Sequence, residues 1–262
     1  MRGWWQDLSD LVLPAQCAGC GRSRTSLCAR CSAALRGAVP GRVRPRPEPP
    51  GLPVVHAAAP YRDAVRAVLL AHKERGALGL ARPLGVALAG AVREGLPARE
   101  QGGGAGTVAL VPVPSAPHAV RARGHDPMRR IAYAAAAELR RTGVPARVLA
   151  VLRQRRPVAD QAGLDARRRL ANVTGALEAA GGSAGLFREV GRIVLVDDLV
   201  TTGASLAEAA RAIHVLTRSA AGSGEGGAGR ERFAVDPGMA GPVMVQAAAI
   251  AASPDSFEIN RN

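Results

Sequence analysis

Lysine, aromatic side chains and long apolar runs are all scarce in this chain of 262 residues. Lys73 is its single lysine, so the formal net charge of +14 comes almost entirely from arginine. Aromatic residues make up 3% of the chain, which argues against a nucleic-acid surface built on base stacking. No stretch approaches the roughly 20 continuous apolar residues that a membrane-spanning helix needs, so we expect no membrane span.

The first ten residues lack the pattern of an export signal. Asp7 and Asp10 stand where a signal peptide needs its apolar run, and the sequence therefore predicts a cytoplasmic chain. Trp4 and Trp5 indicate an N-terminal helix that anchors on a partner or on the domain itself.

Positive charge is concentrated in the middle of the chain. We name the stretch from Arg121 to Arg169 the arginine block. It contains thirteen arginines and four acidic residues. Such a block can line a pyrophosphate pocket, bind nucleic acid or form a solvated face. We favour a mixture of the first and the third, because a GC-rich genome raises the arginine count without any binding role.

All four cysteines lie within fifteen residues, as the pairs Cys17/Cys20 and Cys28/Cys31. Each Cys-x-x-Cys pair forms a tight knuckle with two thiolates, and two such pairs suit a tetrahedral zinc site. The alternatives are a redox dithiol or free buried thiols. A cytoplasmic chain disfavours structural disulfides, and two pairs disfavour a single redox motif. We therefore expect a structural Zn²⁺ in a small module over residues 1–39.

The proline-rich stretch at 40–53 is typical of a stiff linker. Beyond it, up to residue 252, apolar strands alternate with alanine-rich helices, which predicts an α/β domain with a mostly parallel sheet flanked by helices. Residues 218–241 read as a flexible insertion and 253–262 as a loose tail. The expected strands are 54–60, 108–114, 147–152, 193–196 and 243–250, and the expected helices are 63–72, 81–92, 131–141 and 204–217.

The most informative stretch is residues 193–206. Four branched apolar residues predict a short buried strand that ends at Asp197 and Asp198, and a Thr-Thr-Gly loop then leads into a helix. The amino end of a helix carries unpaired N–H groups and a partial positive charge, so it attracts phosphate. The two carboxylates suit ribose hydroxyls or a metal ion; an ordinary strand–turn–helix junction is the alternative. The residues expected to hold a sugar phosphate are Thr201, Thr202, Gly203, Ala204 and Ser205.

Three basic features favour an anionic ligand. Arg121 and Arg123 follow the proline-terminated strand at 108–114, and Lys73 follows a predicted helix. Residues 152–172 combine arginines with proline and glycine, which suits a mobile flap; a solvated arginine-rich helix is the alternative. We expect Lys73, Arg121, Arg123 and the flap to neutralise the negative charge of pyrophosphate.

The acid pair and the Thr-Thr-Gly loop resemble the phosphoribosyl pyrophosphate (PRPP) loop of type I phosphoribosyltransferases. The order of the Cys₄ module, Lys73, Pro112-Val113-Pro114, Arg123-Gly124 and this loop is similar to that of the ComF family. This resemblance implies a type I phosphoribosyltransferase-like domain behind a small zinc-binding segment, and a link to DNA uptake in competence.

Two functions are consistent with these features. As an enzyme, the chain transfers a phosphoribosyl group from PRPP to a nitrogenous acceptor and releases pyrophosphate, with Asp197 and Asp198 as the catalytic pair and Mg²⁺ between them and the pyrophosphate. As a non-catalytic module, it binds a nucleotide or single-stranded DNA and acts with competence proteins in DNA uptake.

Overall fold

The computed structural model describes residues 16–36, 39–98, 106–158, 166–187, 190–222 and 244–257. Three predictions fall outside these residues: the helix at Trp4 and Trp5, most of the insertion at 218–241 and the end of the tail at 258–262. No helix in the described part is long and apolar enough to cross a membrane.

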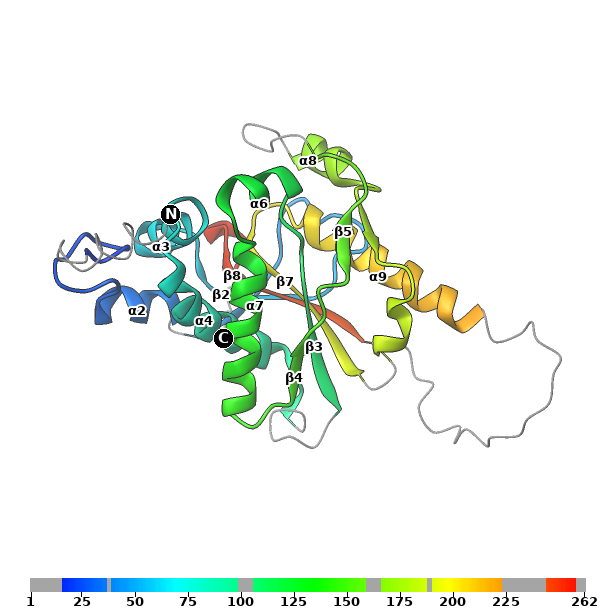
Figure 1. Ribbon diagram of the computed structural model, residues 1–262, viewed down its shortest axis with the longest axis horizontal. Helices are drawn as coiled ribbons and strands as arrows, with labels where there is room; N and C mark the ends of the chain where they lie inside the picture. Colours follow the sequence, from blue (N-terminus) through cyan, green and yellow to red (C-terminus); the bar gives the residue numbers. More distant parts are fainter. Residues whose placement is uncertain are drawn as a thin grey trace.

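A six-stranded, mostly parallel sheet forms the centre of the fold (Figure 1). Its strands lie in the order β1-β2-β8-β7-β3-β4, and every neighbouring pair is parallel except β1 with β2. A second sheet pairs β5 with β6 in antiparallel fashion. The strands span Gly41–Val43 (β1), Val55–Pro60 (β2), Thr107–Pro112 (β3), Ala146–Val148 (β4), Leu152–Gln154 (β5), Leu177–Ala179 (β6), Val190–Val200 (β7) and Val245–Ala252 (β8).

Helices cover both faces of the central sheet (Figure 1). α3, α4 and α7 pack on one face and α9 packs on the other. The structure therefore confirms the predicted α/β class, a mostly parallel sheet flanked by helices with a Cys₄ cluster near the amino terminus. The helices span Ala29–Arg36 (α2), Asp63–Glu74 (α3), Ala81–Gly95 (α4), Pro117–Arg123 (α6), Pro127–Arg141 (α7), Ala166–Val173 (α8) and Ala204–Gly222 (α9).

Side chains of the central strands alternate between two apolar cores, as the pleat of a strand requires. Along β7, Val194 and Val196 face the core under α3, α4 and α7, while Ile193 and Leu195 face the core under α9. This double burial explains why the central strands read as continuous apolar runs in the sequence.

β7 runs further than the sequence predicts. It continues through Asp197 and Asp198 to Val200, so the prediction that this strand ends at the two acids is wrong. The reason is that β8 supplies partners beyond them: Asp197 pairs with Ala249, and Val200 pairs with Ala252. The ladder therefore carries both carboxylates at fixed positions on a strand.

The single strand predicted at 147–152 is in fact two strands in two sheets. β4 is the edge of the main sheet, whereas β5 starts the second sheet. α9 holds this second sheet through β6: the N–H of Leu177 donates to the buried carboxylate of Glu208 at 3.1 Å, and Arg211 donates to the Leu177 carbonyl at 2.9 Å. The second sheet is thus anchored to the helix that follows β7.

The proline-rich residues 40–53 belong to the sheet domain, since β1 lies within them and pairs with β2. Val43 also bridges to Phe257, and the N–H of Arg44 donates to the Ser256 carbonyl at 2.7 Å. Residues 253–257 are therefore held against β1, whereas the sequence predicts a loose tail from residue 253.

Helix starts are predicted better than helix ends. α3, α4 and α9 begin at the expected residues and run two to five residues further than expected. α7 begins four residues early, at Pro127, because the side chain of Asp126 accepts a hydrogen bond from the N–H of Arg129 and caps the helix. α6 occupies the stretch before it, for which the sequence predicts no helix.

Candidate functional site

A cavity of about 800 Å³ opens at the carboxyl ends of β3 and β7. These strands are neighbours, yet β3 continues through α6 and α7 to β4 on one side, and β7 continues through α9 to β8 on the other. Ligands of parallel α/β sheets bind at such a switch point. α6 and α8 lie beyond this end of the sheet and complete the cavity walls (Figure 1).

Asp197 and Asp198 line the cavity from β7. Lys73 Nζ donates a hydrogen bond to Asp198 Oδ2 at 2.7 Å, although 125 residues separate the two in sequence. The N–H of Asp198 donates to Asp197 Oδ1 at 2.8 Å. The structure thus brings three of the predicted site residues together.

Burial raises the pKa of Asp197 to about 8; the adjacent charge of Asp198 adds to the rise and Lys73 opposes it. The attraction of Asp198 raises the pKa of Lys73 against the effect of burial. A carboxyl group that keeps its proton near neutral pH gives it up more readily when a cation or a hydrogen-bond donor binds beside it. The acid pair is therefore suited to a ligand that brings such groups.

The loop at residues 201–205 forms a small cradle where α9 begins. Gly203 has a φ of +74°, a conformation that favours glycine, and the N–H of Ala204 donates to Thr202 Oγ1 at 3.5 Å. Thr201 and Ser205 also line the main cavity. Because unpaired N–H groups at the start of a helix attract anions, this corner is suited to an anionic group.

The proline-rich segment supports this cradle. A Cβ added at Gly203 would lie 3.0 Å from Leu52 Cδ2 and 3.2 Å from Pro45 Cγ. Leu52 packs on the same core as Leu206 of α9. Residues 40–53 therefore pack against the loop at 201–205 and hold it in position.

The predicted cations divide between the cavity and the surface. Arg123 lines the cavity from the end of α6, with its Nε 3.7 Å from Glu74 Oε2. Arg121 is exposed and lies outside the cavity lining, since residues two apart on a helix point in different directions. Arg169 lines the cavity from α8, within the stretch predicted as a flap.

Several cavity residues were not assigned from the sequence. Tyr61 follows β2 and Ser115 follows β3, and their place after strands was the available signal, since the carboxyl ends of parallel strands meet at the site. His118, Met128 and Gln154 come from α6, α7 and β5. Gln154 lies in the stretch 152–172 predicted as a flap, whereas no local pattern marks His118 or Met128, because their elements meet the others only in the folded chain.

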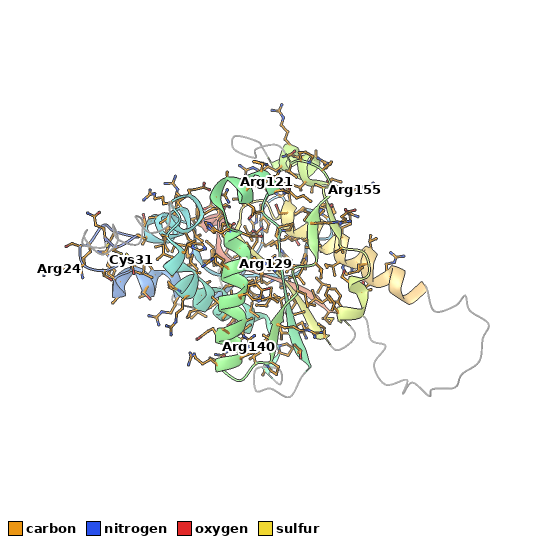
Figure 2. The ribbon with its side chains drawn as sticks, viewed as in Figure 1. Arg24, Cys31, Arg121, Arg129, Arg140 and Arg155 are labelled. Carbon is orange, nitrogen blue, oxygen red and sulfur yellow. The ribbon has the colours of Figure 1, made fainter. Side chains whose placement is uncertain are left out.

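Most of the arginine block lies on the surface. Figure 2 shows Arg121, Arg129 and Arg140 spread along α6 and α7 rather than gathered in one patch. Within the described part of the block, Arg123 and Arg169 line the cavity. The block therefore contributes two arginines to the cavity lining, and the exposed Arg121, Arg129 and Arg140 to the surface.

The four cysteine sulfurs lie within 4.8 Å of one another and could hold a metal such as zinc. Cys20 Sγ and Cys28 Sγ are 3.7 Å apart, close to the edge of roughly 3.8 Å expected for a tetrahedron with zinc–sulfur bonds of about 2.3 Å. Cys17, Cys28 and Cys31 are buried. The four thiols are therefore close enough together to hold one metal ion.

The pKa values of two of these thiols, Cys17 and Cys28, are lowered, which favours their thiolate forms. Burial alone would raise the pKa of Cys17, but hydrogen bonds from the backbone of Cys28 and Cys20 lower it to about 6. A backbone hydrogen bond from Cys31 lowers the pKa of Cys28, whereas burial raises that of Cys31 itself. Because thiolates are the metal-binding form, a bound cation would neutralise the charge that collects here.

The Cys₄ cluster packs against Ala64 at the start of α3. Ala64 contacts the cluster, and a Cβ added at Gly19 would lie 2.7 Å from Cys31 Sγ and 3.2 Å from the Cβ of Ala64. Lys73 lies in the last turn of the same helix. One helix therefore connects the cysteine cluster to the cavity.

Comparison with protein-family models finds no match for this chain, and no curated protein matches it either. What the cavity binds therefore has to be inferred from its residues and their geometry.

Proposed function

We propose that the cavity binds PRPP, or another ligand that contains ribose 5-phosphate, and transfers its phosphoribosyl group to a nitrogenous acceptor. The observation that supports this is that Asp197 and Asp198 line one cavity beside the helix-start cradle, with Asp198 ion-paired to Lys73. A sugar phosphate needs both parts: donors for its phosphate and carboxylates for its vicinal hydroxyls.

Each part of the site has a role in this proposal. The cradle at 201–205 takes the 5-phosphate through the N–H groups and hydroxyls at the start of α9. Asp197 and Asp198 accept hydrogen bonds from the ribose hydroxyls. Lys73 and Arg123, from α3 and α6, supply positive charge for the pyrophosphate.

In the transfer, the bond between C1 of the ribose and the pyrophosphate oxygen breaks, and the pyrophosphate leaves with the electron pair. The lone pair of the acceptor nitrogen forms the new bond to C1, and the proton on that nitrogen passes to water or to the pyrophosphate. Charge separates as the bond breaks, so fixed charges in the cavity lower the barrier. Mg²⁺ held by the pyrophosphate and the two aspartates would add positive charge at the leaving group.

Pyrophosphate release tests this proposal. The chain is incubated with Mg²⁺-PRPP and a panel of purines, pyrimidines and other amines, and we expect release with at least one acceptor. The double variant Asp197→Asn/Asp198→Asn should lose roughly 100-fold or more of this rate. Asp255→Asn, which removes an exposed carboxylate, is the matched control and should keep it. The proposal is wrong if calorimetry detects no PRPP binding and no acceptor supports release.

A non-catalytic module is the second candidate, and exposed arginines favour it. Arg121 and Arg155 are exposed, and both lie toward the end of the sheet where the cavity opens (Figure 2). A chain that holds a nucleotide or single-stranded DNA for DNA uptake would use such groups for phosphate contacts. Salt-sensitive binding of a single-stranded oligonucleotide without any pyrophosphate release would identify this function.

We also propose that the Cys₄ cluster holds a structural Zn²⁺. Four thiolates complete a tetrahedral shell, which leaves no open position for a substrate. The cluster has few apolar neighbours of its own, so the metal would supply much of the stability of the module.

A further inference from the structure

The cavity has two chemically different halves. The half formed by β7, α3 and the start of α9 carries the acids, the lysine and the cradle. The half formed by the second sheet, α8, α7 and the end of β3 is largely apolar and is lined by Val113, Met128, Val158, Val173 and Leu177. An apolar wall of this kind fits the faces of a planar ring.

Arg169 is a basic side chain in the apolar half of the cavity lining. Arg169 of α8 lines the cavity one helical turn before Val173, and its Nε is buried without a hydrogen-bond partner in the described structure. Arg123 Nη1 is also buried without such a partner, but Arg123 Nε lies 3.7 Å from Glu74 Oε2 and Lys73 is paired with Asp198 at 2.7 Å, so each of these two cations already has a carboxylate nearby. A buried guanidinium nitrogen without a partner costs free energy until an acceptor atom reaches it.

The surroundings of Arg169 indicate which kind of anion would reach it. A pyrophosphate carries several charges and is best held by several donors, and the cations Lys73 and Arg123 line the cavity from two other helices, α3 and α6. A carboxylate matches a single guanidinium in a bidentate pair. Gln154 of β5 also lines this half and can hydrogen-bond a polar edge of a ring.

We propose that the acceptor is a planar aromatic or heteroaromatic compound that carries a carboxylate, with its ring against the apolar wall and its carboxylate on Arg169. This inference rests on the proposed phosphoribosyl transfer and names the acceptor class for the same cavity. The acceptor nitrogen faces the ribose half, where its bond to C1 forms as the pyrophosphate leaves.

Binding experiments with matched pairs of compounds test the acceptor class. Calorimetry in the presence of Mg²⁺-PRPP compares orotate with uracil, and anthranilate with aniline, which differ by one carboxylate. We expect the carboxylate member of at least one pair to bind at least tenfold more tightly. Equal affinity within both pairs, or no binding of any member to a chain that binds PRPP, overturns the acceptor class while the proposed function stands.

Variants on α8 identify the residue responsible. Arg169→Gln should abolish the carboxylate preference while Mg²⁺-PRPP still binds with wild-type affinity, and Arg168→Gln, at its exposed neighbour, should change neither. A preference that survives in Arg169→Gln overturns the assignment. Loss of PRPP affinity in folded Arg169→Gln also overturns it, because the arginine would then serve the pyrophosphate. A wild-type chain that binds no PRPP overturns both this inference and the proposed function.

Discussion

Asp197 is a carboxylic acid whose proton the fold retains. Since its pKa is raised to about 8, Asp197 keeps a proton in the folded chain that it has lost in the unfolded chain between about pH 4 and pH 8. The contribution of Asp197 to the free energy of unfolding therefore falls as the pH rises through this window and levels off above it. Urea denaturation at pH 5 and pH 8 should show a loss above about 1 kcal/mol, since a difference of one in pKa corresponds to about 1.4 kcal/mol.

Asp197→Asn removes the titrating group, and most of this pH dependence should disappear with it. Asp255→Asn, at an exposed position, is the control and should retain the wild-type slope. If Asp197→Asn shows the same fall between pH 5 and pH 8 as the wild type, the raised pKa of Asp197 is not its cause.

Single residues also show the limit of sequence reasoning at the site. Asp197, Asp198 and the Thr-Thr-Gly loop were recognisable because they are contiguous. The pairing of Lys73 with Asp198 joins residues 125 positions apart, and no local pattern contains it. Arg169 was part of a predicted flap, but its apolar surroundings come from α8 and β6 together.

At the scale of elements, the crossing of α4 and α7 depends on one missing side chain. A Cβ at Gly85 would lie 2.5 Å from the Cβ of Ala134 and 2.8 Å from backbone atoms of α7. Gly85→Ala must therefore push the helices apart, and we expect a loss of about 1–3 kcal/mol in urea denaturation.

Gly90, in the same helix, provides the matched control. Its nearest neighbour would be Pro40 Cγ at 3.6 Å, an ordinary contact, so Gly90→Ala should gain up to about 1 kcal/mol from helix propensity. Equal effects of the two substitutions would show that propensity, and not the crossing, dominates at Gly85.

The contact between the proline-rich segment and the phosphate cradle is also testable. Gly203→Ala faces Leu52 Cδ2 at 3.0 Å and a φ of +74°, so it should cost about 1–3 kcal/mol and weaken PRPP binding in calorimetry. Adding Leu52→Ala relieves the crowding but leaves the backbone strain. Partial recovery of PRPP affinity in the double variant, relative to Leu52→Ala alone, is the expected result; no recovery would assign the whole effect to the backbone.

Local signals predicted the starts of α3, α4 and α9, because apolar spacing and loop residues mark them in the sequence. Local signals failed where pairing with a strand far away in the sequence determines the extent of a strand. β7 extends past its acids because β8 pairs with it there, and residues 147–152 divide because β5 finds its partner in β6. Pairing between strands far apart in sequence is not encoded in any short window.

For the whole molecule, a structural zinc predicts that residues 16–36 and the central sheet respond differently to removal of the metal. Purified chain should contain about one zinc per molecule by elemental analysis, and a strong chelator should release it. Hydrogen exchange over residues 16–36 should then accelerate, because the cluster has few apolar neighbours of its own. The central sheet, with two large cores, should keep its protection.

Cys31→Ser should reproduce the effect of the chelator, since Cys31 is buried at the centre of the cluster, 1% exposed. Ser32→Ala, its neighbour on α2, should bind zinc normally. Purified wild-type chain without metal, and with unchanged exchange after chelation, would contradict the structural zinc.

The strand order also bears on how the chain is made. β8 is the last of the described strands along the chain, yet it lies between β2 and β7 in the sheet. Until the ribosome has released residues 245–252, β1 and β2 have no parallel neighbour, and β7 ends an incomplete sheet with an open edge. Unpaired edges of this kind are prone to aggregation. Synthesis of β8 is therefore the step that joins β1 and β2 to the rest of the sheet, and interruption before it leaves the edges of β2 and β7 unpaired.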